Sequence, residues 1–167
     1  MPDGWTWCRF SNVYELLSGR DLKPSEYNDA NNGTPYITGA SNFTNGIISL
    51  IRWTTVPQVI TKKGDVLITC KGTIGEIAIN SFDDAHIARQ IMAIRNHYKL
   101  DVHYLSMCMK YYVEMLKCAA KGLIPGISRE DILSLIMPLP PLAEQTRIAD
   151  SVIKYISILE DIEKSLS

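Results

Sequence analysis

The sequence predicts an α+β protein: a small antiparallel β-barrel or curved sheet with flanking helices, followed by a C-terminal helix of the coiled-coil type. Three observations lead to this class. Residues 36–95 consist of short β-branched runs separated by turn residues, residues 101–120 carry a broad apolar stripe at helical spacing, and residues 142–167 carry a heptad repeat. We therefore divide the chain into a domain at residues 1–141 and a spacer or dimerisation helix at residues 142–167.

The composition is that of a globular protein. Of 167 residues, 46% are hydrophobic and 21% are charged, which excludes disordered and collagen-like chains. No apolar run is long enough to cross a membrane, and no signal peptide precedes the first runs, so we expect a cytoplasmic protein. The four cysteines lie far apart without a C-x-x-C motif, which indicates free thiols and no metal site.

The first half of the chain is predicted to hold one short helix and then strands. Asn12 and Glu15 have the spacing of a capping box and Gly19 is suited to end a helix, so residues 12–18 are predicted to be helical. A polar loop at residues 20–34 follows. The predicted strands are residues 36–38, 47–51, 58–61, 66–70, 74–79 and 91–95.

Two further helices and an extended connector are predicted in the second half. Asp101 is placed to cap a helix over residues 101–120, and Ser128 with Asp131 has the spacing to cap a short helix ending near residue 135. Pro138, Pro140 and Pro141 keep the following segment out of the helical region, so it is predicted to be extended.

The last segment carries apolar residues at alternating steps of four and three. This spacing is typical of a helix that packs against another helix. The chain shows no helix stop signal at its end, so we expect a partner helix in another chain or a helix that continues in a longer protein. The predicted partner-helix contacts are Ile148, Val152, Tyr155, Leu159 and Ile162.

The net charge of −1 hides a strong pattern along the chain. Residues 52–71 and 86–129 have net charges of +3 and +5, whereas residues 72–85 and 130–167 have net charges of −3 and −4. The folded protein is therefore predicted to present one basic face and one acidic end. The alternative is a solvated surface of mixed charge.

No motif of a common enzyme class is present. The G-T-I-G stretch at residues 72–75 is neither a phosphate loop nor a dinucleotide fingerprint, and the three histidines have no metal-ligand spacing. Asp65, Lys71 and Glu76 resemble the acidic and basic groups of a metal-dependent nuclease only loosely. The lysine of such a site alternates with the second acid along one strand, and Ile77 and Ala78 stand there instead. A turn formed by Gly64 and Asp65 explains these residues better.

Four motifs occur in an order that resembles a known family. They are W-T-W-C-R-F-S-N-V from residue 5, P-Y-I-T-G-A-S from residue 35, G-D-V-L-I-T-C-K-G-T-I-G from residue 64 and P-L-P-P-L-A-E-Q-T-R-I-A from residue 138. Together they resemble one target recognition domain, with the start of its spacer helix, of the specificity subunit of type I restriction-modification systems. The resemblance covers nearly the whole chain. A full specificity subunit has two such units, so this chain resembles a half subunit or a part of a longer one.

The resemblance implies a DNA-binding subunit without catalytic residues or cofactors of its own. Such a subunit recognises double-stranded DNA and recruits modification subunits that methylate adenine and a restriction subunit that cleaves. S-adenosylmethionine, ATP and magnesium are then expected only on those partner subunits. A homodimer or a second half subunit, joined through the C-terminal helix, is a further expected partner, and no membrane is expected.

Residues with basic, amide or hydroxyl side chains in the polar loops are the candidates for DNA contact. For phosphate contact they are Lys62, Lys63, Lys71, Gly72, Thr73 and Lys121, and for base reading Arg20, Lys23, Ser41, Asn42, Arg52, Thr54, Arg89 and Gln90. No metal ligand or catalytic residue is expected.

Two other functions fit the sequence. One is the recognition domain of a restriction enzyme fused to its methyltransferase, and the other is a protein-binding adaptor that does not contact DNA. Salt-sensitive retention on DNA favours recognition, whereas weak or salt-insensitive binding to every duplex favours the adaptor.

Overall fold

The computed structural model describes residues 2–119 and 126–166. The strands are β1 (Thr6–Arg9), β2 (Tyr14–Ser18), β3 (Thr34–Ile37), β4 (Phe43–Thr44), β5 (Ile47–Ile48), β6 (Trp53–Thr54), β7 (Ile60–Lys62), β8 (Val66–Thr69), β9 (Ile77–Ile79), β10 (Asp84–Ile87), β11 (Ile91–Asn96) and β12 (Ile136–Leu139). The helices are α1 (Val102–Ala119), α2 (Arg129–Leu133) and α3 (Leu142–Leu166), with short 3-10 turns at Phe10–Asn12, Pro24–Glu26 and Ala40–Asn42. None of the described helices is long and apolar enough to span a membrane.

Two four-stranded sheets form the body of the domain. One is antiparallel, in the order β2-β11-β8-β9, and the other has the order β6-β3-β10-β7 with β3 and β10 parallel. The predicted α+β class is confirmed, but the strands in the described ranges do not close into a barrel. The parallel pair explains the difference, because paired residues such as Tyr36 and His86 are 50 positions apart in the sequence and such long-range pairing leaves no local signal.

The helix predicted at residues 12–18 is wrong, because Tyr14–Ser18 form strand β2. Tyr14 and Leu16 are buried while Glu15 is exposed, which is the period of two of a strand. The strand pairs with β11, where Leu16 lies opposite Ile94. Pairing with a long central strand therefore overrides the local capping signal.

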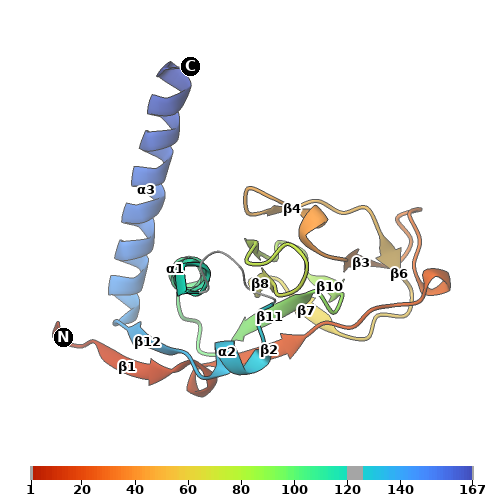
Figure 1. The fold of residues 1–167 in the computed structure, drawn as a ribbon, viewed down its shortest axis with the longest axis horizontal. Helices are drawn as coiled ribbons and strands as arrows, with labels where there is room; N and C mark the ends of the chain where they lie inside the picture. The colour runs from red at the N-terminus through yellow and green to blue at the C-terminus, as the bar shows by residue number, and fades with distance from the viewer. Residues whose placement is uncertain (1, 120–125, 167) are drawn as a thin grey trace.

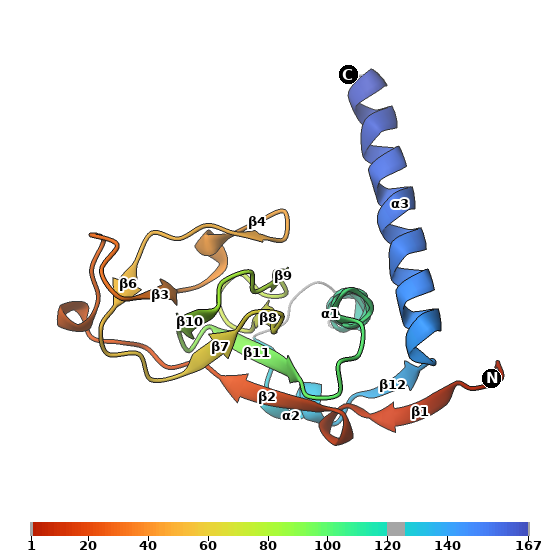
Figure 2. The ribbon, with the colours of Figure 1, turned by 180° about the vertical axis from the view of Figure 1, so that it is seen from behind.

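The core lies on both faces of the antiparallel sheet. Val66 and Ile68 point to one face, where they pack with Leu105 and Met109 of α1. Leu67 points to the other face and packs against the second sheet. The layers are therefore helix, sheet and sheet, with α1 covering one side, as Figures 1 and 2 show from opposite directions.

The predicted helix at residues 101–120 is confirmed for the described part, which ends at residue 119. Asp101 caps it by accepting hydrogen bonds from the backbone amides of His103 and Tyr104 at 2.9 and 3.0 Å. Ser128 caps α2 as predicted, with its hydroxyl accepting from the Asp131 amide. These ends were predictable because a cap is a local interaction between residues three apart.

The proline-rich connector is extended, as predicted, and in addition it pairs as a strand. Residues Ile136–Leu139 lie antiparallel to Thr6–Arg9, with Trp7 opposite Pro138. This two-stranded ribbon leads directly into α3, which projects away from the sheets (Figure 1). The division of the chain at residue 141 stays a prediction, although a helix does begin at Leu142.

Candidate nucleic-acid interface

The tight turn between β10 and β11 is the centre of the candidate interface. The Ile91 amide donates to the Ala88 carbonyl at 2.9 Å, which places Arg89 and Gln90 at the exposed tip. Asp21 fixes the turn, because its carboxylate accepts from the Arg89 amide at 3.0 Å and lies 2.8 Å from the Arg89 guanidinium. Asp21 therefore fixes the backbone of the turn from which the Arg89 and Gln90 side chains project.

Three other chain segments meet this turn. The Arg20 amide donates to Ile87 at 2.9 Å, and the Cys70 amide donates to Gln90 at 2.8 Å. Gly39 lies so close to the Gln90 side chain that a Cβ there would collide with the amide oxygen of Gln90. The loops that follow β2, β3 and β8 thus come together at one end of the domain.

We define the turn face as the predicted DNA contacts that these segments carry. All are exposed, and Ser41 and Thr73 line one hollow of about 540 Å³. Cationic, amide and hydroxyl groups at one site match the needs of phosphate and base-edge contact. The turn face consists of Arg20, Ser41, Lys71, Gly72, Thr73, Arg89 and Gln90.

Lys23 and Arg52 lie next to the turn face along the segment at residues 20–27. The Arg52 guanidinium stacks over the Tyr27 ring at 4.8 Å from its centroid, and that ring packs against Tyr36. The Lys23 side chain is exposed. Stacking fixes the direction of the Arg52 side chain while its nitrogen atoms remain available for further hydrogen bonds.

Asn42 and Thr54, two of the predicted base readers, are fully buried. The Asn42 side-chain oxygen accepts from the amide and hydroxyl of Thr38, and its nitrogen donates to Ser49 at 2.8 Å. The Thr54 hydroxyl donates to the Glu26 carbonyl at 2.6 Å. Their polar atoms already have partners inside the domain, so we leave both residues out of the proposed interface.

The basic residues do not all gather on one face. Lys62 and Lys63 precede β8 whereas Lys71 follows it, so these lysines lie at opposite ends of that strand. Lys62 also pairs with Asp84 at 2.6 Å. Lys121 lies outside the described residues. The predicted basic face is therefore limited to the turn face and its neighbours.

Asp65, the candidate nuclease carboxylate, has a structural role. Its side chain is 5% exposed and accepts hydrogen bonds from the Thr61 hydroxyl, the Lys62 amide and the Arg95 guanidinium, the last at 2.9 Å. Within residues 2–119 and 126–166, no group of three potential ligands is suited to a metal ion. The turn interpretation of Gly64 and Asp65 agrees with this geometry.

A buried histidine supports the sheet beneath the segment at residues 20–27. His86 packs against the Tyr36 ring, with the ring centroids 4.9 Å apart, and its Nδ1 atom lies 3.1 Å from the Val59 amide nitrogen. Burial lowers the pKa of His86 below its usual value, so the ring is neutral at physiological pH. No extra positive charge therefore comes from this position.

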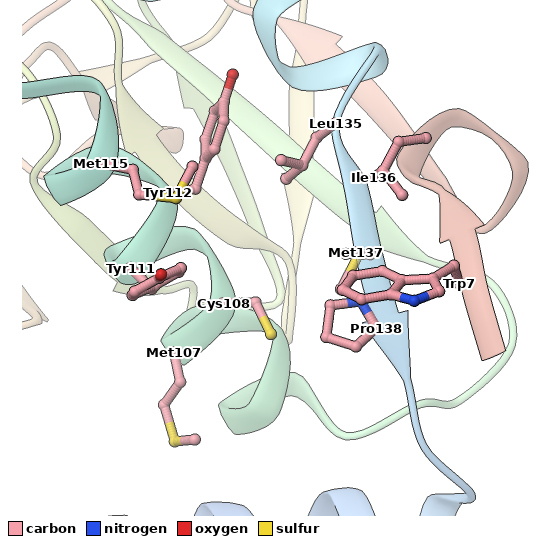
Figure 3. Close-up of a pocket in the computed structure, with 10 residues that line it drawn as sticks. All are labelled: Trp7, Met107, Cys108, Tyr111, Tyr112, Met115, Leu135, Ile136, Met137 and Pro138. Atoms are coloured by element: carbon pink, nitrogen blue, oxygen red, sulfur yellow. The ribbon is translucent and has the colours of Figure 1, made fainter. Parts of the chain in front are cut away.

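An apolar hollow lies elsewhere, between α1 and β12 (Figure 3). It has a volume of about 580 Å³, and residues such as Trp7, Tyr111 and Met137 line it. Cys108 also lines it, and burial raises the pKa of this thiol, so it stays protonated at neutral pH. The lining contains no ionised group and none of the predicted DNA contacts, so this hollow is not suited to phosphate groups.

The base of α3 is locked to α1 by a buried glutamine. Gln145 is fully buried, its side-chain oxygen accepts from the Asp101 amide at 3.1 Å and its nitrogen donates to Pro140 at 2.8 Å. Thr146 donates to the Asp101 carboxylate at 2.8 Å. Burial opposes ionisation of Asp101, but the hydrogen bonds from Tyr104, Thr146 and His103 lower its pKa overall. Because the pKa of Asp101 is lower in the folded state, its ionised carboxylate stabilises the fold at neutral pH. This stabilisation is lost as the pH falls below the usual aspartate range.

The predicted partner-helix residues divide into two groups. Ile148 packs on the domain core and Val152 is partly buried. Tyr155, Leu159 and Ile162 are exposed by 66, 60 and 48%, respectively. The apolar stripe therefore starts on the domain and continues along the projecting part of α3.

Sequence reasoning missed the β4–β5 hairpin beside the turn face. Its turn is Asn45-Gly46, with φ angles of 51° and 78°, and only its second strand lies within a predicted strand, residues 47–51. The Asn-Gly pair between apolar residues is the usual signal for a two-residue hairpin. Gln145 was also missed as an anchor, because burial of a polar side chain depends on contacts that are distant in sequence.

The fold and the candidate interface together indicate a class of protein: a mixed α/β domain whose loops carry basic and amide groups, joined to a projecting helix that bears an apolar stripe. The chain belongs to the family of type I restriction modification DNA specificity domains, whose model matches residues 2–167. The resemblance seen in the motifs is thereby confirmed.

Known proteins similar to this chain support the same family. A putative type I restriction enzyme MjaX specificity subunit of Methanocaldococcus jannaschii is 26% identical over 166 residues, which are 97% of this chain and 38% of the relative. The crystal structure of the HsdS subunit from Thermoanaerobacter tengcongensis matches with a TM-score of 0.88 and 26% identity, over 100% of this chain and 41% of that one. A structure described in terms of complex assembly and conformational transition of the type I R-M system matches with a TM-score of 0.89 and 26% identity, over 99 and 41% of the two chains. The chain thus spans about two fifths of the length of these relatives.

Proposed function

We propose that this chain recognises a specific sequence in double-stranded DNA, as the specificity subunit or half subunit of a type I restriction-modification system. The observation that carries the proposal is the turn face, where seven exposed predicted contacts from four segments meet at one end of the domain. Family membership supports it. The chain acts as a reader and has no catalytic role.

The turn face offers different chemistry for backbone and bases. Lys71, the Gly72 amide and the Thr73 hydroxyl suit phosphate oxygens, and the surroundings of Gly72 are open, because no heavy atom lies within 4 Å of the position that a Cβ would occupy. Arg20 and Arg89 suit the two acceptors of guanine, and Gln90 suits adenine. The turn face thus offers groups for phosphate contacts, which position the DNA, and groups for base contacts, which recognise its sequence.

The proposed role assigns the chemistry to partner subunits. Modification subunits methylate adenine and a restriction subunit cleaves DNA, so S-adenosylmethionine, ATP and magnesium bind to those partners. Complex assembly in the type I R-M system is the subject of one similar structure, which supports this arrangement. The role also implies a location in the cytoplasm.

The DNA proposal is tested by changing one lysine on the turn face. Lys71→Ala is expected to weaken binding to a pool of random duplexes about 3- to 10-fold and to reduce the slope of log affinity against log salt by about 1, because one phosphate contact is lost. Fluorescence anisotropy across a salt series measures both quantities.

The matched control is Lys62→Ala, which removes the same side chain at the opposite end of β8 and is expected to leave the slope unchanged. Equal effects of the two substitutions would show that the turn face is not the interface. Weak, salt-insensitive binding of the unaltered chain would favour the protein-binding adaptor.

The exposed stripe of α3 is proposed to pack against α3 of a second copy of this chain. The heptad spacing supports this occupant, because such a repeat matches another helix of the same kind. The relatives are more than twice as long as this chain, which leaves room for a second unit of the same type. Two such helices side by side would hold two recognition domains at a fixed separation.

Self-association tests the helix proposal. Leu159→Ser removes a large apolar group from the stripe and is expected to weaken dimer formation at least 10-fold, since a buried leucine contributes about 2 kcal/mol. Sedimentation equilibrium measures the dimer dissociation constant. Ile153→Ser is the control, because Ile153 is 47% exposed on the same helix but off the heptad stripe. A chain that stays monomeric at high concentration contradicts the proposal.

A further inference from the structure

The β4–β5 hairpin is a small element that belongs to neither four-stranded sheet. Phe43 pairs with Ile48 and Thr44 with Ile47, and this two-stranded ribbon forms a sheet of its own. Residues 44–47 are all exposed, and Ile47 is 69% exposed. Figures 1 and 2 show the hairpin on the same side of the domain in both views, above β8 and β9. The exposed tip of this hairpin therefore offers two polar side chains, Thr44 and Asn45, and one aliphatic side chain, Ile47, to a partner.

The base of this hairpin is rigid. Phe43 and Ile48 are buried in the core between the two sheets. Asn42 joins the two sides, because its amide nitrogen donates to the Ser49 carbonyl and the Ser49 amide donates to the Asn42 carbonyl, both at 2.8 Å. Asn42 is therefore a positioning residue for the hairpin. Because the base of the hairpin is fixed, the tip loses little conformational entropy when a partner binds to it.

The tip of the hairpin borders the turn face. Thr44 and Asn45 line the hollow of about 540 Å³ together with Ser41 and Thr73. The hairpin itself has no charged residue, and Glu76 is the one acidic group among the residues that line the hollow. The adjoining lysine and arginine residues of the turn face attract a polyanion to this side of the domain.

We infer that the β4–β5 hairpin enters the major groove, where Asn45 reads an adenine and Ile47 packs on a neighbouring thymine methyl group. A two-stranded ribbon fits the width of that groove, and the side-chain amide of asparagine pairs with the two polar atoms on the adenine edge. An aliphatic side chain is matched by the thymine methyl group. The inference rests on the proposed function and assigns it two specificity residues, Asn45 and Ile47.

The experiment uses the full chain together with its modification subunits and a library of random duplexes. The preferred duplex is selected first with the unaltered protein, and each of its base pairs is then replaced in turn. Asn45→Gly and Ile47→Ala are compared with the unaltered protein on this series. Glycine keeps the left-handed turn at position 45 and removes only the side-chain amide.

Each substitution is expected to lower the preference for one A·T pair by about 5- to 100-fold while the preferences at other positions stay the same. The control is Lys99→Gly, at another exposed position with positive φ (55°), beyond the far end of β11 from the turn face. It is expected to change no base preference. Equal thermal midpoints of the unaltered and altered chains establish that the fold is retained.

The outcomes separate this inference from the proposed function. Normal selection by the unaltered protein, with unchanged preferences in both hairpin variants, overturns the hairpin inference and leaves the proposed function intact. Failure of the unaltered protein to select any sequence overturns both. A uniform loss of affinity at every duplex, without loss of preference, assigns the hairpin to non-specific contact or to a protein partner and also overturns the inference.

Discussion

Replacing Asp65 with alanine is expected to lower the free energy of unfolding by about 3–5 kcal/mol, the usual cost of breaking a buried ion pair from one side. Asp65 is 5% and Arg95 22% exposed at the side chain. The substitution leaves the Arg95 guanidinium without its carboxylate, and the Thr61 hydroxyl and Lys62 amide without their acceptor. Chemical denaturation followed by tryptophan fluorescence measures the change.

The exposed ion pair of Lys62 and Asp84 provides the control for this experiment. Both side chains are at least half exposed, so Asp84→Ala is expected to cost less than about 1 kcal/mol. A loss below about 1 kcal/mol for Asp65→Ala as well would contradict the structural role of Asp65. If Asp65→Ala does not accumulate, Asp65→Asn keeps the acceptor oxygen and is expected to show a smaller loss of the same sign.

Gly75→Ala is expected to destabilise the domain by about 2–4 kcal/mol for two reasons, left-handed strain and overpacking. Gly75 has a φ of 87°, and a Cβ there would collide with Cγ1 of Val113 on α1. Val113 is 1% exposed and, as a β-branched residue in a helix, has one strongly preferred rotamer, so it cannot turn aside. Thermal and chemical denaturation both report this loss.

Gly72→Ala separates the effect of left-handed strain from the effect of overpacking. It has a φ of 74° but no heavy atom within 4 Å of the position that a Cβ would occupy, so Gly72→Ala is expected to show the strain alone, about 1–2 kcal/mol. The difference between the two variants measures the steric contact with α1. Equal losses in the free energy of unfolding for Gly72→Ala and Gly75→Ala would show that the G-T-I-G turn does not pack against α1 as described.

Much of the secondary structure was predictable because its causes are local. Helices α1 and α2 carry their own caps, and strands such as β8 and β11 are continuous β-branched or apolar runs. Strand β10 was missed, since its sequence Asp-Ala-His-Ile has little strand propensity and is held by β3 and β7. Strand β2 was mistaken for a helix for the same reason, because its pairing with β11 is decided far away in the sequence.

The chemistry of the candidate interface could be predicted from residue types, but which of those residues are exposed together could not. Residue type suggested Asn42 and Arg89 equally, yet one side chain is fully buried and the other lies exposed at the turn between β10 and β11. Charge counting along the chain likewise grouped Lys62 with Lys71, although β8 separates them, and it counted Arg95, which pairs with Asp65. Sequence distance does not report which end of a strand a side chain occupies.

The sequence by itself determined the family, the mixed class of the fold, the capped helices and the apolar stripe of α3, because each of these depends on residue spacing within a short segment. Only the tertiary structure decided that the sheets stay open and that three loops converge on the β10–β11 turn. It also decided that Gln145 locks α3 to α1. These features depend on pairing between distant segments, and their stability comes from burial that forms only when those segments meet.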